Sequence, residues 1–213
     1  MVTLLHMNQK TFNYVSWAAV IGSVLLATLA WGGGINWNIA GINGYQLFPL
    51  FGLIAWMTMA NHYYLGSVRL LSSSLKRPKL FGKISEYIVL ASFLLHPGIL
   101  AYEQSNNGQG LPPESFYSYR GGGLKLAMIL GTVSLLVFLS FEVFNRIKHN
   151  KIIAKYWWAI SLSQSLAMIL IWVHAWRLGS DLGGSWFQIV WLIYGFALIP
   201  SFYIIHRSDF ADE

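Results

Sequence analysis

Six long apolar stretches constrain the fold of this chain more than any other feature of its sequence. Each is close to the about 20 residues that a helix needs to cross a bilayer. Hydrophobic residues make up 55% of the 213 residues and charged residues only 10%, against roughly 25% charged in an ordinary soluble domain. The sequence therefore predicts an all-α, polytopic membrane protein in which residues 1–213 form a single six-helix transmembrane bundle. The predicted spans run approximately over Phe12–Trp31, Tyr45–Val68, Leu80–Tyr102, Leu124–Phe144, Tyr156–Trp176 and Trp186–Ile205.

The positions of lysine and arginine predict the orientation of these spans. Basic residues crowd the second and fourth connections, and Lys10 and Arg207 fall on the same side. The positive-inside rule then makes both termini cytoplasmic, in a multi-pass protein of the cell membrane. This placement also accounts for the net charge of +6, so no nucleic-acid partner is expected. The first span is too long in its apolar core for a cleavable signal peptide, and we expect it to be retained. The basic residues of the two connections are Arg69, Lys76, Arg77, Lys79, Lys83, Arg146, Lys148, Lys151 and Lys155.

Two histidines lie inside otherwise apolar spans, His96 in ASFLLHPGIL and His174 in ILIWVHAWRLG. An ionisable ring at membrane depth is costly and usually holds a partner, a proton or a metal. Both spans enter from the cytoplasm, and the helical rise puts the two rings about 24 Å and about 27 Å along them. Because the chain has no cysteine, iron–sulfur clusters and cysteine-ligated zinc are excluded. The pair is predicted to ligate the iron of one bis-histidine heme b, and hydrogen-bonded core histidines are an equally open alternative.

An arginine and a polar connection near the outer ends of these spans could contribute to the same site. Arg177 lies one helical turn beyond His174 and is predicted to pair with a heme propionate; taken alone, it is a snorkelling interface residue. The polar connection from Glu103 to Gly123 either folds over a site that opens outward or is a passive linker. No GxGxxG motif stands in the strand–helix context of a nucleotide site, so a separate component must deliver electrons.

The two histidine segments resemble the third and fifth helices of ferric reductase-like transmembrane domains. The similar segments are FGKISEYIVLASFLLHPGIL and KYWWAISLSQSLAMILIWVHAWRLG, and the resemblance extends over about Tyr45 to Ile205. It implies an oxidoreductase subunit that passes electrons through b hemes held between these two helices. The family includes the heme-bearing membrane subunit of a periplasmic methionine sulfoxide reductase system. Two-heme members have a further histidine 13 or 14 residues before each of these, where this chain has Gly82 or Lys83, and Ser161. The resemblance therefore implies one heme, near the outer face.

A polar cluster is predicted near the level of the missing inner heme. His62 and Gln164 could hydrogen-bond a quinone headgroup there and accept its proton, together with Asn61, Ser161 and Ser165. The alternatives are that these side chains bond one another across helices, or that His62 ligates a second heme. The sequence thus predicts a heme b electron-transfer protein, supplied by a quinol or a separate flavoprotein and delivering to an acceptor at the outer face. A heme-free transporter or channel and an assembly subunit are the other classes; transport is disfavoured because intramembrane charges are few.

Overall fold

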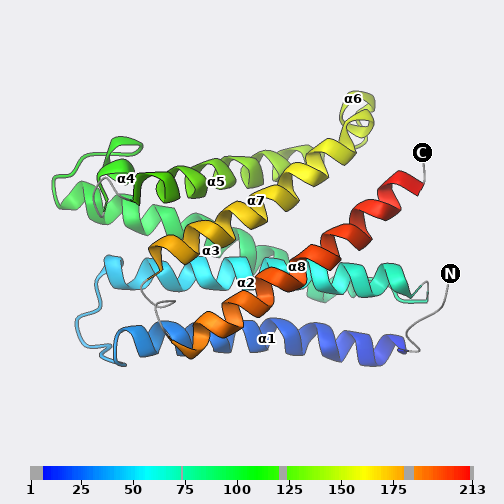
Figure 1. Cartoon of the computed structure of the whole chain (residues 1–213), viewed down its shortest axis with the longest axis horizontal. Coiled ribbons are helices and arrows are strands. Elements are labelled where there is room, and N and C mark those ends of the chain that lie inside the picture. The colour runs from blue at the N-terminus through cyan, green and yellow to red at the C-terminus, as the bar shows by residue number, and fades with distance from the viewer. Residues whose placement is uncertain (1–6, 73, 120–123, 180–184, 212–213) are drawn as a thin grey trace.

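Helices are the regular secondary structure in the part of the chain that the computed structural model describes, which comprises residues 7–72, 74–119, 124–179 and 185–211. No strand occurs within these ranges, in agreement with the predicted all-α class. The helices cover the six predicted stretches, except that Leu124 and Tyr156 lie one residue before their helices. Figure 1 labels them as α1 (Gln9–Gly34), α2 (Gly44–Leu71), α3 (Lys79–Asn106), α4 (Glu114–Ser118), α5 (Lys125–Arg146), α6 (Lys151–Lys155), α7 (Trp157–Leu178) and α8 (Trp186–Ala211).

The first two long helices begin at asparagine caps. The Asn8 side chain accepts a hydrogen bond from the Thr11 amide at the start of α1. At the start of α2, Asn43 and Gln46 form a reciprocal capping box, each side chain bonding the backbone of the other. Such caps satisfy amide groups that have no carbonyl partner within the helix. They fix where each helix emerges from its connection.

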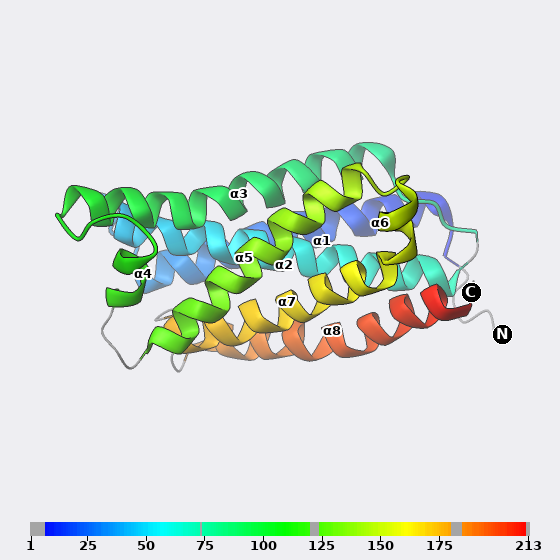
Figure 2. The same ribbon diagram turned by 90° about the horizontal axis from the view of Figure 1, so that it is seen from above.

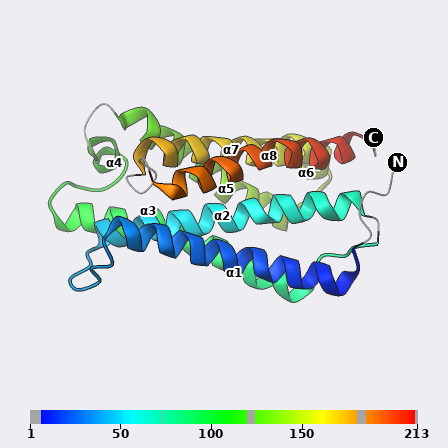
Figure 3. The same cartoon turned by 60° about the horizontal axis from the view of Figure 1, so that its bottom comes forward.

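Five helices are long and apolar enough to cross a membrane: α1, α3, α5, α7 and the Trp186–Arg207 part of α8. The 28-residue α2 is not among these five. It lies in the middle of the bundle (Figure 3) and packs against α1, α3, α7 and α8. Most of its side chains therefore face protein, and polar residues such as Asn61 and Thr58 are buried on it. The structure supports a multi-pass helical membrane protein.

The helices fall into two packed groups. In one group α2 packs along α1, α3 and α8, and in the other α5 packs along α7. The described chain ends lie at the same end of the bundle, and α4 lies at the opposite end (Figures 1 and 2). We refer to the latter as the α4 end. That the termini share one end agrees with the predicted even number of crossings.

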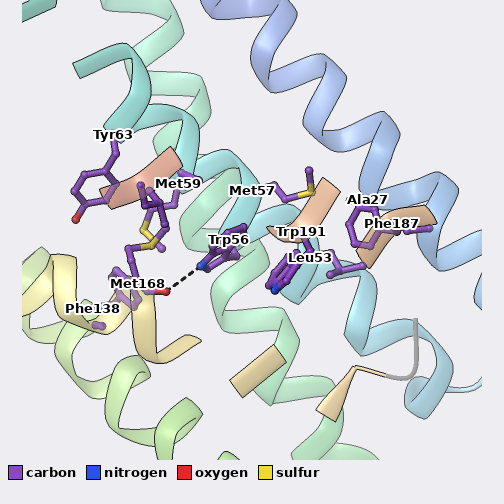
Figure 4. Close-up of a cluster of buried hydrophobic side chains, with 14 residues drawn as sticks. Ala27, Leu53, Trp56, Met57, Met59, Tyr63, Phe138, Met168, Phe187 and Trp191 are labelled. Atoms are coloured by element: carbon purple, nitrogen blue, oxygen red, sulfur yellow. Dashed lines mark hydrogen bonds between the residues drawn. The ribbon is translucent and has the colours of Figure 1, made fainter. Parts of the chain in front are cut away.

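A buried cluster of aromatic and methionine side chains joins the two groups. Trp56 of α2 donates its indole N–H to the Met168 carbonyl of α7 at 3.1 Å (Figure 4). Its ring also lies 4.1 Å from that of Trp191 of α8. Trp172 and Trp191 donate to each other's carbonyl oxygens, which ties α7 to α8. Since every one of these buried N–H groups has a carbonyl partner, the tryptophans fix the register of α2, α7 and α8 without leaving a desolvated donor.

Candidate functional site

His96 of α3 and His174 of α7 lie side by side in the gap between the two helix groups. Their ring centroids are 6.5 Å apart, and the ring planes are nearly perpendicular, at 85°. The two residues are 78 positions apart in the sequence. The structure therefore brings together the two histidines that the sequence singled out.

Each imidazole is oriented by a backbone carbonyl of a neighbouring helix. His96 Nδ1 lies 2.9 Å from the Phe48 carbonyl oxygen of α2, and His174 Nδ1 lies 2.7 Å from the Ala127 carbonyl oxygen of α5. A carbonyl oxygen only accepts, so the hydrogen must be on Nδ1 in both rings. The neutral ring then carries its lone pair on Nε2. This arrangement is the one in which histidine binds a metal, with the second nitrogen held by an outer partner.

Two glycines make room for the two rings, and sequence reasoning missed them. A Cβ atom on Gly52 would lie 2.7 Å from His96 Nδ1, and one on Gly131 would lie 2.5 Å from His174 Cε1. Each glycine is four residues after the residue whose carbonyl bonds the histidine, in FPLFG on α2 and AMILG on α5. The α2–α3 and α5–α7 pairs therefore use the same device. A glycine inside an apolar span was the signal that could have identified both.

The two rings line a cavity of about 460 Å³ between the helix groups. Its volume falls in the range of roughly 300–1,000 Å³ that is usual for small-molecule sites. Among the residues that the structure describes, no Asp, Glu, Lys or Arg lines it. Apolar and aromatic side chains dominate its walls, which include Trp31, Phe48, Leu53, Trp56, Phe93, Pro97, Leu100, Met128, Leu135, Ile171 and Trp191. Such a lining suits a large, flat and mainly apolar ligand.

The connection between α3 and α5 folds over this cavity, so it is not a passive linker. Phe116 and Tyr119, in and just after α4, line the cavity. The Tyr119 ring is stacked on that of Tyr45, with centroids 6.2 Å apart and planes at 5°. The buried Gln104 side chain donates to the Ser115 carbonyl at 2.8 Å and holds α4 against the end of α3. Residues 120–123 of the same connection lie outside the described residues.

Arg177 does not line the cavity, and it is exposed on the surface of α7. Successive residues of a helix are about 100° apart. Ala175 and Leu178, which do line the cavity, therefore lie on one side of His174, while Arg177 lies on the other. His174 and Arg177 are one turn apart on α7, but only His174 points toward the cavity.

The polar side chains that were predicted to form one inner cluster face different neighbours. His62 Nδ1 lies 3.3 Å from an Arg77 nitrogen, and Arg77 also binds Glu86 at 2.7 Å. Asn61 faces α1, where it donates to the Ala19 carbonyl and the Ser23 hydroxyl. Asn61 therefore forms hydrogen bonds to a neighbouring helix, which was the alternative to a quinone site.

The α7 part of the same predicted cluster belongs to another network. Ser165 is 2.9 Å from His206 Nε2 of α8 and 3.4 Å from the Tyr63 hydroxyl of α2. His206, near the end of α8, was not among the side chains predicted for this cluster. Gln164, next to Ser165, is half-buried. Within the described ranges of the chain, no hydrogen bond joins Gln164 to His62.

Gly82, where the resemblance would place an inner heme ligand, is in contact with a side chain of the same chain. The Arg77 guanidinium packs over Gly82, where a Cβ atom would lie 2.9 Å from Arg77 Nε. Arg77 thus fills the space beside Gly82. Among the described residues, no group of three or more His, Asp or Glu side chains could hold a metal ion. A heme differs from such a site, because its macrocycle supplies four of the iron ligands and the protein only two.

Comparison with known proteins does not assign this site to a family. No protein-family model, no curated protein and no solved structure matches the chain.

Proposed function

We propose that this protein is a six-span membrane electron-transfer protein that holds one heme b between His96 and His174. The observation that carries the proposal is the close approach of the two imidazole rings of α3 and α7, whose centroids lie 6.5 Å apart. A histidine–metal bond is about 2 Å long, and an imidazole centroid lies about 1.1 Å behind its nitrogen. Two histidines on opposite sides of one iron would therefore have centroids about 6.2 Å apart, close to the 6.5 Å found here.

The surroundings of the pair support a heme in particular. The Nδ1–carbonyl bonds leave the Nε2 lone pair of each ring available to a metal, and Gly52 and Gly131 leave space for the two rings. The cavity between them has apolar walls, as the faces of a porphyrin require. When bound, the heme would supply a reversible one-electron acceptor and donor. The protein's own part is to bind it, to orient its ligands and to keep water from it with the α4 cover.

The positive-inside rule supports one side of the membrane for the site. We place α2 as the sixth span, since it has the length of the others and lies among them. The basic second and fourth connections and both termini are then cytoplasmic, and the α4 end, with the histidine pair, faces outward. The acceptor is reached at this outer end. The donor is a quinol of the membrane or a separate flavoprotein, because the chain has no nucleotide-binding motif.

The likeness to ferric reductase-like transmembrane domains agrees with this proposal at the positions of His96 and His174. It departs at Gly82 and Ser161, so the proposal has one heme rather than two. Electrons would enter at the level of this heme and not along a chain of hemes from the cytoplasm.

The deciding experiment is an absorption spectrum of the purified, full-length protein. We expect a Soret band and the sharp bands of a low-spin b heme on reduction. His96→Ala and His174→Ala should each abolish the low-spin spectrum, and the double variant should lose the heme. His149→Ala, in the exposed connection before α6, is the matched control and should retain it. A colourless protein after expression with sufficient heme, or a double variant that keeps the low-spin spectrum, would refute the proposal and favour the transporter or assembly classes.

A further inference from the structure

The cavity is lined on one side by α3 and on another by α5, and both helices are candidate membrane spans. In the described part of the chain, α3 packs along α2 and α5 packs along α7, but α3 and α5 do not pack along each other. Figure 2 shows their ends nearest α4 well apart. A ring contact joins them further from α4, between Phe93 and Phe138 with centroids 4.9 Å apart. Between this contact and the α4 end, the cavity is lined by Pro97 and Leu100 of α3 and by Thr132 and Leu135 of α5.

Thr132 is the polar side chain of this gap. Its hydroxyl hydrogen is donated to the Met128 carbonyl at 3.0 Å, one turn earlier on α5. The oxygen therefore retains its lone pairs, which can accept a hydrogen bond from a ligand in the cavity. With no charged residue on the described walls, the gap suits a neutral ligand that carries a hydroxyl group. A ligand that arrives from this side must be soluble in the bilayer.

We propose that the gap between α3 and α5 is the entry site for a membrane quinol, whose hydroxyl binds Thr132. This inference rests on the proposed function and replaces the inner cluster of His62 and Gln164 as the place of the quinone. It requires no inner heme, because the donor approaches at the level of the histidine pair. Each quinol oxidised to quinone would give up two electrons, one at a time, to the outer acceptor through a heme held by His96 and His174, and two protons to water at the α4 end.

The test is photolabelling of the full-length protein in nanodiscs with an azidoquinone, followed by peptide mapping. We expect label in the segments 93–100 of α3 and 128–135 of α5. Leu135→Trp should block the gap and remove most of the label. Leu136→Trp is the matched control, because Leu136 is 59% exposed on the same helix and does not line the cavity. Leu135→Phe is a smaller obstruction, should the tryptophan disturb the fold, and should reduce the label in part.

A kinetic measurement tests the role of Thr132. Thr132→Val keeps the shape of the side chain but removes its hydroxyl, and it should slow reduction of the heme by decylubiquinol about twofold to tenfold, the worth of one hydrogen bond. Reduction by dithionite should be unchanged, and Thr132→Ser should restore the quinol rate. Thr28→Val is the control, because Thr28 makes the same bond to a preceding carbonyl on α1 away from the cavity.

The outcomes separate the two proposals. A protein without a Soret band refutes the proposed function, and this inference with it. A heme-bearing protein refutes the entry site alone if the label falls on the segments around His62 and Gln164, or if Leu135→Trp labels and reduces like Leu136→Trp. Reduction by a flavoprotein but not by decylubiquinol also refutes the entry site alone.

Discussion

Gly52 and Gly131 offer the sharpest test of how the protein would hold a heme. An alanine at position 52 would place its Cβ atom 2.7 Å from His96 Nδ1, and one at position 131 would place it 2.5 Å from His174 Cε1. Ordinary contacts of this kind begin at 3.4 Å. The rings would therefore have to move by about 0.7 Å and about 0.9 Å, a shift that a close-packed interior resists.

Such shifts break the bonds that orient the ligands. The Nδ1–carbonyl distances of 2.9 and 2.7 Å would approach or pass the limit of a hydrogen bond. Loss of an outer partner of a ligating histidine typically costs about 10–100-fold in metal affinity. We expect Gly52→Ala and Gly131→Ala each to lower heme affinity by about this factor. The double variant should lose less than the product of the two factors, because both act on one shared ligand pair.

The assay is titration of the heme-free protein with hemin, followed at the Soret band, together with the heme content after purification. Gly98→Ala is the control, because it lies on α3 close to His96 and a Cβ atom there meets nothing within 4 Å. Alanine is the better helix former by about 1 kcal/mol, so a weakened helix cannot explain a loss of heme. If Gly52→Ala and Gly131→Ala bind hemin as tightly as Gly98→Ala, the geometric reasoning is wrong.

Three further predictions follow from the geometry of the site. Because the ring planes lie 85° apart, the ferric protein should give the strongly anisotropic low-spin EPR signal of perpendicular imidazoles; a rhombic signal typical of parallel planes would contradict the structure. Gln104→Leu should destabilise the α4 cover by about 0.5–1.5 kcal/mol, because the bond from the Gln104 side chain to the Ser115 carbonyl is lost while the bond from the Tyr119 amide remains, and limited proteolysis of the α3–α5 connection should accelerate; equal cleavage of Gln104→Leu and the exposed-site control Gln109→Leu would argue against this role. Arg177→Gln should leave hemin affinity within about twofold, since Arg177 lies off the cavity wall and exposed charges contribute little; a loss of tenfold or more would restore the predicted propionate contact.

The sequence by itself determined the secondary structure and the chemistry of the candidate site. A chain crossing a bilayer must satisfy its backbone hydrogen bonds within each segment, so a long apolar stretch is a helix whatever its neighbours are. A histidine in such a stretch is conspicuous for the same reason, since few residues there are ionisable. His96 and His174 could therefore be selected from residue type and depth alone. Even α2, with its buried polar residues, could be assigned as a helix.

The rotation of each helix about its axis was decided only by the tertiary structure. Lipid and protein interior are both apolar, so the apolar pattern of a span does not say which face turns inward. For this reason Arg177 was expected on the same wall as His174, and His62 was grouped with Gln164 although it faces Arg77. Gly52 and Gly131 were missed because a glycine matters only when another helix brings a ring against it. Contacts between two helices depend on the shapes of the side chains of both. They therefore cannot be predicted from the sequence of one span alone.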